Sequence, residues 1–337
     1  MFREVMNKLI DKIDLTQEEM IGIMNEIMDG NVSQLRIAAF LTALRMKGET
    51  IEEIVGCAKV MRQKSIPIYI KDEYALDTCG TGGDGKHTFN VSTVAAIIAA
   101  SAGVTTVKHG NRSVSSKCGS ADVLEELGIQ IDLDSKTIQD CIKKTNFGFL
   151  FAPKFHLSMK HVAPIRRELG VRTIFNVLGP LTNPAKVNTQ IMGVYNEHLT
   201  EPIAEVLKQL GIKRACVLHS LDGMDEISIF EDTKVTELKD GRLETYYIQP
   251  KKFGFKEYPF KAVQGESPEE NAIIILDILH GKRGAPRDIA LINAAAAIYI
   301  GNGADNLQEG FEKAIYAVDS GNALDTFNAL IAFTKGK

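Results

Sequence analysis

Apolar residues recur at helical spacing through the first 65 residues of the chain. A capping box at residues 16–19 precedes one apolar stripe, and Gly30 is placed to end that helix. Ser33 can cap a second helix, and residues 50–53 form another capping box. The apolar positions of the second helix include Leu35, Ala38, Leu41 and Leu44. We predict short amphipathic helices that bury these stripes against each other or against a partner subunit.

From residue 75 onward, strand-like apolar runs alternate with helical patterns. The expected strands lie at residues 75–79, 104–108, 148–151, 190–195 and 215–219. The expected helices between them lie at residues 94–101, 121–127, 135–144 and 201–210, and the first of these is apolar on all sides. We therefore predict an α/β fold: a small N-terminal α-helical domain, then a larger α/β domain with a mostly parallel central sheet flanked by helices.

Length and composition agree with two domains. At 337 residues the chain exceeds the usual size of one hydrophobic core, and 45% hydrophobic with 24% charged residues is typical of a globular protein. A formal net charge of -4 gives no general attraction for nucleic acid. An anion-binding site would have to be built locally from a few Lys and Arg side chains.

No segment of the sequence has the pattern of a membrane span or a secretion signal. No apolar run reaches the roughly 18 residues needed to cross a bilayer. The first 15 residues alternate charged and apolar side chains. The five cysteines are odd in number, widely spaced and without a CxxC pair, which indicates reduced thiols and not a disulfide framework or zinc site. We expect a cytoplasmic protein with no membrane partner.

The segment CGTGGDGKHTFNVST, residues 79–93, places four glycines within six residues. It matches GxGxxG, but the next expected strand ends in Lys108 and His109, where a dinucleotide site needs an acid for the ribose. It also matches GxxxxGK, but His87 stands where a P-loop needs Ser or Thr to hold magnesium. Neither motif is therefore complete.

Both motifs share a physical property that this segment keeps. Glycines adopt backbone angles closed to other residues and let main-chain N–H groups approach a phosphate. Asn90, Ser92 and Thr93 follow where the apolar helix begins, so hydroxyls and the positive end of the helix dipole meet at the same point. We predict a phosphate-binding loop, with a flexible turn as the alternative.

A second loop, KHGNRSVSSKCGSAD at residues 108–122, follows the next expected strand. Lys108, Arg112 and Lys117 bring positive charge, and several serines bring hydroxyl donors. Ser120 is the expected cap of the following helix. Loops at the same end of neighbouring parallel strands face one crevice, which favours a shared anion site over a solvated basic turn.

Three acids follow the strand expected at residues 215–219. Asp222, Asp225 and Glu226 form a compact cluster in the sequence HSLDGMDEIS. Mg²⁺ in proteins is usually bound by one or two carboxylates together with phosphate oxygens of the substrate. The cluster therefore predicts a magnesium site, with an acidic surface turn as the alternative.

Two arginines and two histidines are candidates for the rest of the crevice. Arg166 and Arg167 fall on a helical pattern, so one can point inward, where its planar fork suits a carboxylate, while the other is solvated. His156 and His161 lie just before them. For both histidines a packed or surface role is favoured, and contact with substrate is the alternative.

Together these segments closely resemble the anthranilate phosphoribosyltransferase family. The resemblance is carried by GTGGD at 80–84, NVST at 90–93, KHGNRSVSS at 108–116, GSAD at 119–122, VAPIRRELGVRTIFNVLGPLTNP at 162–184 and MDE at 224–226. The order of these motifs and the helical beginning agree as well, so the likeness covers essentially the whole chain.

The resemblance implies an activity and an architecture. The family transfers 5-phosphoribose from phosphoribosyl pyrophosphate to the amine of anthranilate in tryptophan biosynthesis, with Mg²⁺, and two ions per subunit are expected. Its fold implies a helical domain at residues 1–70 that forms a homodimer, with a returning segment near 170–188. The α/β domain at residues 71–337 is implied to be of the nucleoside-phosphorylase type and to bind phosphoribosyl pyrophosphate.

The resemblance also implies site residues, position by position. Those implied to surround phosphoribosyl pyrophosphate are Gly80, Gly83, Asp84, Thr88, Asn90, Val91, Ser92, Thr93, Lys108, His109, Gly110, Asn111, Arg112, Ser113, Val114, Ser115, Ser116 and Ser120. Those implied to contact anthranilate are Gly80, Asn111 and Arg166, with His109 nearby, and those implied to hold metal are Ser92, Asp225 and Glu226. No general base is assigned, because the amine of anthranilate can attack the anomeric carbon itself once both substrates are oriented.

The chain departs from the family pattern at two places. Leu157 and Ser158 stand where Pro and Ala are common, which affects the expected shape of the anthranilate entrance. Cys118 stands where Ser is frequent, and its neighbours Lys117 and Lys108 predict a reactive thiolate if the loop is open.

Two alternative functions remain at this point. A pyrimidine nucleoside phosphorylase has a related fold, but a site for phosphate alone would not require the metal pair Asp225 and Glu226. A non-catalytic relative that binds nucleic acid would need a broad basic face, whereas this chain is net acidic. We therefore expect small-molecule substrates and no nucleic-acid partner.

Overall fold

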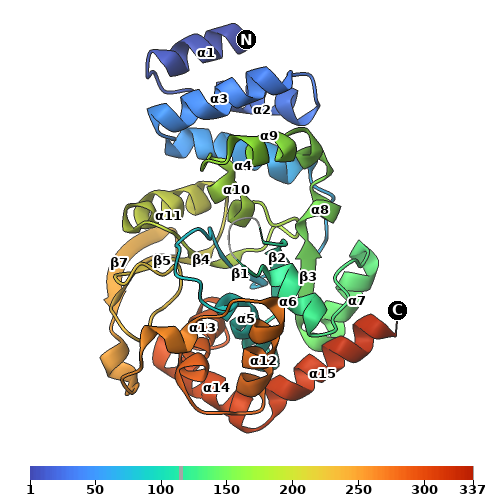
Figure 1. The fold of residues 1–337 in the computed structure, drawn as a ribbon, viewed down its shortest axis with the longest axis vertical. Coiled ribbons are helices and arrows are strands. Elements are labelled where there is room, and N and C mark those ends of the chain that lie inside the picture. The colour runs from blue at the N-terminus through green and yellow to red at the C-terminus, as the bar shows by residue number, and fades with distance from the viewer. Residues whose placement is uncertain (114–116, 337) are drawn as a thin grey trace.

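The computed structural model describes residues 1–113 and 117–336 of the chain. Figure 1 shows a helical unit at the N-terminal end, next to a sheet whose other face is covered by helices from the C-terminal part. The predicted fold class is confirmed, because a small α-helical unit precedes a larger α/β unit with a mostly parallel sheet. No helix among the described residues is both long and apolar enough to cross a bilayer.

Four helices form the N-terminal unit: α1 (Phe2–Ile10), α2 (Gln17–Met28), α3 (Gln34–Lys47) and α4 (Ile51–Lys64). Both predicted capping boxes are confirmed, since Thr16 and Thr50 each exchange hydrogen bonds with the glutamate three residues later. Ser33 stands at the N-cap of α3, but its side chain makes no capping hydrogen bond. Two later helices, α9 (Ala163–Leu169) and α10 (Phe175–Leu181), pack into the same hydrophobic core.

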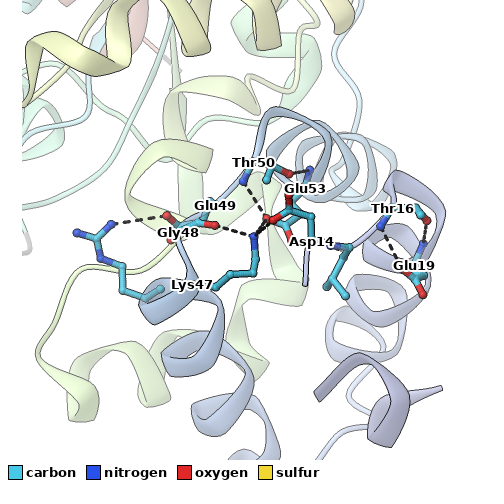
Figure 2. A network of polar contacts seen from close by, with 10 residues as sticks. Asp14, Thr16, Glu19, Lys47, Gly48, Glu49, Thr50 and Glu53 are labelled. Carbon is cyan, nitrogen blue, oxygen red and sulfur yellow. Dashed lines mark hydrogen bonds and ion pairs between the residues drawn. The ribbon is translucent and has the colours of Figure 1, made fainter. Parts of the chain in front are cut away.

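A buried ion pair joins the loops between these helices (Figure 2). Lys47 Nζ lies 3.0 Å from Oε2 of the fully buried Glu53 and 2.7 Å from Asp14 Oδ1. Glu53 also accepts the N–H groups of Leu15 at 2.9 Å and of Thr50 at 2.8 Å. Because this carboxylate has a cation and two N–H donors, its burial is compensated, and it ties the α1–α2 loop to the start of α4.

One seven-stranded sheet has the order β3-β2-β1-β4-β5-β6-β7. Its strands are β1 (Leu76–Gly80), β2 (Thr106–Gly110), β3 (Phe147–Phe151), β4 (Thr189–Gly193), β5 (Arg214–Ser220), β6 (Thr233–Lys239) and β7 (Arg242–Ile248). The pairs among β1 to β5 are parallel, whereas β6 and β7 add an antiparallel hairpin. All five predicted strands are confirmed, and the hairpin was not predicted.

Helices connect the strands and cover the sheet. They are α5 (Val91–Ser101), α6 (Ser120–Glu126), α7 (Ser135–Thr145), α8 (Ala152–Phe155), α11 (Thr200–Gln209), α12 (Pro268–Leu279), α13 (Ala285–Ile300), α14 (Leu307–Asp319) and α15 (Asn322–Lys335). Short 3-10 turns are η1 (Leu157–His161), η2 (Glu197–Leu199), η3 (Pro250–Phe253) and η4 (Phe260–Val263). Apart from its first turn and its last residue, α5 is buried on all sides, as its apolar pattern predicts, and it packs against α13.

The two faces of the sheet belong to two hydrophobic cores. Along β5, Cys216 and Leu218 point into the core with α5 and α13, while Ala215 and Val217 point into the core that includes the N-terminal helices. In the sheet, β2 lies beside β1 on one side and β4 lies beside β1 on the other side. The ends of β1 and β4 therefore form a topological switch point, where open α/β sheets bind ligands.

Candidate active site

The glycine-rich loop after β1 exposes a row of main-chain donors. Gly82, Gly83 and Gly85 have φ angles of +63°, +77° and +72°, which only glycine adopts without strain. Within the described part of the chain, the N–H groups of Gly83, Asp84 and Gly85 donate to no acceptor. Three consecutive N–H groups left in this way form a concave donor set that suits a phosphate or pyrophosphate group.

The second half of this loop is held by a distant segment. Thr88 forms an antiparallel bridge with Gln264, and the N–H of Gly265 donates to the carbonyl of His87 at 3.0 Å. Gln264 Nε2 also donates to the carbonyl of Lys86 at 3.0 Å. The loop is therefore anchored on one side while its glycines keep their donors available.

The start of α5 brings one hydroxyl to the glycine-rich loop. Val91 and Thr93 have fully buried side chains, and their N–H groups donate to the carbonyls of Phe89 and Asn90. The Asn90 amide is occupied, because its Nδ2 donates to the carbonyl of Cys118 at 3.3 Å and its Oδ1 accepts from Cys118 Sγ at 3.2 Å. Asn90 thus ties the two predicted phosphate loops together, and Ser92 supplies the half-buried hydroxyl.

Lys108 places a buried cation beside that hydroxyl. Its Nζ lies 3.2 Å from Ser92 Oγ and also donates to the carbonyl of Thr78. Burial lowers the pKa of Lys108, and the negative charges of Asp77 and Glu226 oppose that shift. Lys108 Nζ also lies 3.5 Å from Thr78 Oγ1, so protein oxygens hold this ammonium group in place and its positive charge stays beside the start of α5.

Asp77 is a buried carboxylate next to this lysine. Its Oδ1 accepts the N–H of His109 at 3.2 Å, and Oδ2 has no partner among the described residues. Burial raises the pKa of Asp77 to about 6, and Lys108 works against the rise. No sequence motif marks this acid, which lies inside β1 and faces the interior.

The second loop neutralises part of its own positive charge. Arg112 pairs with Asp122 at 3.2 Å and with Glu125, and Lys117 Nζ lies 3.0 Å from Glu266 Oε1. Three predicted contacts, Val114, Ser115 and Ser116, lie outside the described residues. The expected cluster of exposed basic side chains is therefore partly paired within the protein.

The cap of α6 differs from the prediction. Gly119, not Ser120, stands at the N-cap, and Asp122 accepts the N–H groups of Gly119 and Ser113 at 2.9 Å each. Ser120 is the first helical residue, and its hydroxyl lies 3.5 Å from the carbonyl of Asn111. A carboxylate three residues into the helix closes the loop more strongly than the serine would, because it accepts two N–H groups.

Gly110 and Asn111 stand where β2 ends. A Cβ at Gly110 would lie 2.7 Å from the ring of Phe149, so the strand end needs glycine there. Asn111 is exposed, and its Oδ1 accepts the N–H of Arg112 at 2.8 Å. Its Nδ2 donates to no acceptor among the described residues, which leaves it available to a ligand.

The acidic cluster is assembled differently from the sequence prediction. Asp225 Oδ2 accepts the N–H of Gly82 at 2.9 Å, and the N–H of Asp225 lies 3.4 Å from Asp84 Oδ2. Asp222 does not join them, since it accepts the N–H of Met224 and the hydroxyl of Ser228 and so only shapes the turn. Asp84 takes its place beside the acid pair.

Burial and mutual repulsion raise the pKa values of these acids. Burial, followed by the charge of Asp84, raises the pKa of Asp225 to about 7. Burial and Asp225 raise the pKa of Glu226, while Lys108 partly offsets the rise. Such a group of oxygen ligands is stabilised in its charged form by a hard divalent cation.

The donor set fits magnesium with substrate better than a metal held by protein alone. The described ranges 1–113 and 117–336 contain no group of three or more His, Cys, Asp or Glu that could hold an ion. Mg²⁺ is usually bound by one or two carboxylates, with substrate phosphates and water completing its octahedron. Asp225, Glu226 and the Ser92 hydroxyl match that pattern.

Arg166 and two neutral imidazoles, those of His109 and His156, are the candidates for the anthranilate end of the site. Arg166 in α9 lies with its guanidinium carbon 5.3 Å from the ring centre of Phe175, while Arg167 is exposed. The rings of His109 and His156 lie 5.1 Å apart, and burial lowers their pKa values to about 3 and about 4. A half-buried cation over the ring of Phe175 suits an aromatic carboxylate.

His161 and the two unusual residues lie at the edge of this region. His161 packs against Gly30, where a Cβ would lie 2.7 Å from the imidazole Cε1, so it joins η1 to the helical unit. Leu157 is 57% exposed. Ser158 lines a small hollow together with Met28 and His156. The departures from the family pattern therefore fall on the surface beside the histidine pair.

The surroundings of Cys118 do not favour the predicted reactive thiolate. Its side chain is only 9% exposed, and burial raises its pKa to about 12, with Asp122 adding to the rise. The two lysines expected to stabilise the thiolate bind other groups, Glu266 for Lys117 and Thr78 with Ser92 for Lys108. Burial of this thiol does not favour the thiolate that the prediction requires.

Sequence reasoning missed three residues that shape the site. Gly193 ends β4 opposite Gly80 in register, and both strand ends lie against Asp225. Arg172 and Tyr195 hold the glycine-rich loop from the side of α10. Gly193 lies inside the strand expected at residues 190–195, and the actual strand ends there, so its role at a strand end could not be read from the sequence.

Comparisons with known proteins bear on the whole chain. The model of a glycosyl transferase family, helical bundle domain, matches residues 3–65, and the model of its a/b domain matches residues 72–324. The anthranilate phosphoribosyltransferase of Alkaliphilus metalliredigens is 53% identical over 335 residues, which are 99% of each chain. That of Clostridium kluyveri is 52% identical over 333 residues, again 99% of each chain.

Solved structures of two such enzymes have the same fold as this chain. The enzyme from Thermus thermophilus has a TM-score of 0.92 and 40% identity, with 98% of this chain and 99% of that chain covered. The enzyme from Saccharomyces cerevisiae in complex with PRPP and Mg has a TM-score of 0.91 and 30% identity, with 100% and 98% covered. With both family models matched in order and this identity over nearly its full length, the chain belongs to the anthranilate phosphoribosyltransferase family of glycosyl transferases.

Proposed function

We propose that the chain transfers 5-phosphoribose from phosphoribosyl pyrophosphate to the amine of anthranilate, giving N-(5-phosphoribosyl)anthranilate and pyrophosphate. The names of its relatives support this activity. The yeast enzyme has been solved with PRPP and Mg and with 4-fluoroanthranilate. Tryptophan biosynthesis follows as the pathway that this reaction serves.

One observation on this chain carries the proposal. The unbonded N–H groups of Gly83, Asp84 and Gly85 lie in the same loop whose Gly82 binds Asp225, beside Glu226. A metal-bound polyphosphate would use both features, because its oxygens accept from the N–H donors while its metal ion binds the acids. The topological switch point provides the crevice that such a ligand needs.

The implied site residues divide into groups with different tasks. Gly80, Gly83, Asp84 and Thr88 of the first loop, the start of α5, Lys108 and the loop from His109 to Ser120 bind phosphoribosyl pyrophosphate. Arg166, with Gly80 and Asn111, binds anthranilate through its carboxylate and amine. Val91 and Thr93 support this task indirectly, because their side chains are buried and their N–H groups bond to Phe89 and Asn90 at the start of α5.

Metal binding is proposed for Asp225, Glu226 and Ser92, with two Mg²⁺ ions per subunit. When bound, Mg²⁺ supplies Lewis-acid stabilisation of the charge on the pyrophosphate. Lys108 adds a positive charge: its Nζ donates to Ser92 Oγ and interacts electrostatically with the nearby acids. Removal of the ion should therefore affect binding and turnover together.

The protein's part in the reaction is orientation and charge stabilisation. The amine of anthranilate attacks the anomeric carbon as the pyrophosphate leaves, so no side chain has to act as a nucleophile. Main-chain N–H groups and Lys108 oppose the charge that grows on the leaving group. His109 and His156 are neutral at physiological pH, since burial lowers both pKa values. In this proposal they pack around the aromatic ring of anthranilate.

The quaternary structure is part of the proposal. Leu35 and Met46 on α3 are 82% and 79% exposed, although Leu35 belongs to an apolar stripe that was expected to be buried. We propose that this face pairs with a second copy in a cytoplasmic homodimer, with residues 1–70 and the 170–188 segment forming the dimerisation domain and residues 71–337 the α/β domain. Sedimentation velocity should give twice the chain mass.

Neither alternative function gains support from these observations. A pyrimidine nucleoside phosphorylase would bind phosphate without needing the acids Asp225 and Glu226. A relative that binds nucleic acid would need an open basic loop, whereas Arg112 and Lys117 are already paired with acids.

The test is a direct assay with the purified protein. Anthranilate fluorescence should fall when phosphoribosyl pyrophosphate and Mg²⁺ are both present. It should stay constant when either is omitted or when a chelator removes the metal. No fall at high enzyme concentration, with a folded protein by thermal melting, would exclude the proposed activity.

A further inference from the structure

Arg172 connects the helical unit to the glycine-rich loop. It lies in the turn between α9 and α10, and its Nη2 donates to the carbonyl of Gly83 at 2.7 Å. Its guanidinium carbon lies 4.3 Å from the ring centre of Tyr195, which is close for a cation–π contact. The same tyrosine donates its N–H to Thr81 Oγ1 at 3.1 Å, so both residues hold the loop.

Peptide geometry gives the Gly83 contact a directional effect. A trans peptide is planar, so its C=O and the following N–H point in opposite directions. Arg172 therefore fixes the direction of the Asp84 N–H, the middle member of the unbonded donor set, by holding the Gly83 carbonyl. Glycine at 83 has no side chain to restrain this peptide, and its φ of +77° is one that other residues rarely adopt.

The anchor of Arg172 is rigid although its side chain is exposed. The residues that follow it, Ile174 and Phe175, are buried in the core of the helical unit. Arg166 lies in α9, the short helix that immediately precedes the turn with Arg172. The segment that carries the proposed anthranilate contact thus also carries the guanidinium that holds the loop.

We propose that Arg172 is a positioning residue for the pyrophosphate group of the donor substrate, acting through the Gly83–Asp84 peptide. This role rests on the proposed function for the identity of the substrate. Arg172 does not touch the reacting atoms. It keeps the peptide turned so that the Asp84 N–H stays directed at the anion, and Tyr195 keeps the guanidinium in place.

The experiment compares Arg172→Ala and Arg172→Lys with Arg167→Ala. Arg167 is an exposed arginine of α9 with no hydrogen bond or ion pair among the described residues, which makes it the matched control. Arg172→Ala should raise the KM for phosphoribosyl pyrophosphate by about tenfold or more, as expected for loss of a charge-assisted hydrogen bond. The KM for anthranilate and the melting temperature should change little, and Arg172→Lys should recover part of the loss.

Binding of magnesium pyrophosphate, measured by calorimetry, provides a readout without turnover. Weaker binding in Arg172→Ala, with normal binding in Arg167→Ala, supports the role even if the wild-type protein fails to consume anthranilate, in which case only the proposed function falls. An unchanged KM and unchanged pyrophosphate binding in Arg172→Ala would overturn it, as would equal losses for both substrates. If that variant does not fold, Tyr195→Leu, which removes the aromatic face, should show the same selective loss in smaller degree, and an unaffected Tyr195→Leu would count against the role.

Discussion

Gly193 lies so close to Asp225 that residue 193 has no room for a side chain. A Cβ built there would overlap the carbonyl oxygen of Asp225. Gly80 is the partner of Gly193 in the β1–β4 register, and a Cβ at Gly80 would lie 2.5 Å from Asp225 Oδ2. Two glycines on paired strand ends therefore form the surface on which the acidic loop sits.

This contact predicts that Gly193→Ala displaces the acidic loop. Overpacking of this kind usually costs about 1–3 kcal/mol when the structure must shift to relieve it. We expect turnover to fall at least about tenfold, with a higher Mg²⁺ requirement, measured by anthranilate fluorescence over a magnesium titration. Gly22→Ala is the control, because its Cβ would meet only the flexible Met1 side chain. Normal Mg²⁺ dependence in Gly193→Ala would contradict the prediction.

Arg166→Ala should weaken anthranilate binding and spare the other substrate. Loss of a charge-assisted contact of about 1.5–3 kcal/mol corresponds to a ten- to hundredfold drop in affinity. Steady-state kinetics for both substrates measure the two effects separately. Arg167→Ala should be nearly silent, since that side chain is exposed and makes no hydrogen bond or ion pair within the described ranges. An equal loss for phosphoribosyl pyrophosphate would show that Arg166 is misassigned.

Local signals explain why much of the fold could be predicted. Capping boxes at Thr16 and Thr50 depend on residues three positions apart, and strand runs depend on alternation and apolar length. The β6–β7 hairpin had a comparable signal in the sequence, the pair Asp240–Gly241. Both residues have positive φ at the turn, as this kind of hairpin requires. That hairpin could have been predicted from the Asp-Gly pair between two strand-like runs.

The missed parts of the site depend on contacts between distant positions. Arg172 meets Gly83 across 89 positions, and Asp225 meets Gly82 across 143. No periodicity or short motif fixes such a pair, because strand order and register must be known first. The exclusion of Asp222 has a different cause, because Ser228, only six positions away, donates its hydroxyl to the Asp222 carboxylate within the turn.

The buried imidazole of His156 predicts a pH dependence of stability. Burial lowers its pKa to about 4, whereas an unfolded histidine has a pKa of about 6.5. Between these values the unfolded state binds the proton and the folded state does not, so stability falls as the pH drops from 6.5 toward 4. Above pH 6.5 the group has no effect.

We therefore expect His156→Gln to unfold with a shallower acid dependence. Across this window the free energy of unfolding falls with decreasing pH in the wild type. In the variant that slope should be smaller by up to about 1.4 kcal/mol per pH unit. Urea unfolding at several pH values measures both slopes. His198→Gln, at an exposed histidine, should keep the wild-type slope. Parallel curves for His156→Gln and the wild type would show that this imidazole already carries a proton in the folded protein.

Cys118 should be unreactive in the native protein. Burial raises its pKa to about 12, so very little thiolate exists at pH 8. Iodoacetamide should label it only after unfolding, as peptide mapping by mass spectrometry can measure. Cys118→Ser should remain active, because a hydroxyl can still donate to Asn90 Oδ1. Rapid native labelling, prevented by phosphoribosyl pyrophosphate, would instead show that the loop opens in solution.

Changing Asp225 to Asn and Glu226 to Gln together tests the metal assignment. The pair keeps its size but loses the charge that binds Mg²⁺, so activity should fall at least about a hundredfold, in line with the several kcal/mol expected from a Lewis-acid ion. Added Mg²⁺ should restore part of it if Ser92 and the substrate still capture the ion. The fold should survive, because removing two carboxylates whose pKa values are raised by burial relieves repulsion with Asp84.

The two ligands should respond differently in this double variant. Calorimetry should show weaker phosphoribosyl pyrophosphate binding in the presence of Mg²⁺ and nearly unchanged anthranilate binding, because Arg166 lies on α9 and not in the acidic loop. Thermal melting checks that the protein is folded. Asp222→Asn is the matched control, since that acid accepts the N–H of Met224 and the hydroxyl of Ser228 within the turn and leaves the metal ligands intact. Normal turnover with normal Mg²⁺ dependence in the double variant would mean that Asp225 and Glu226 only shape a turn, and that the ion is held by the substrate and other residues.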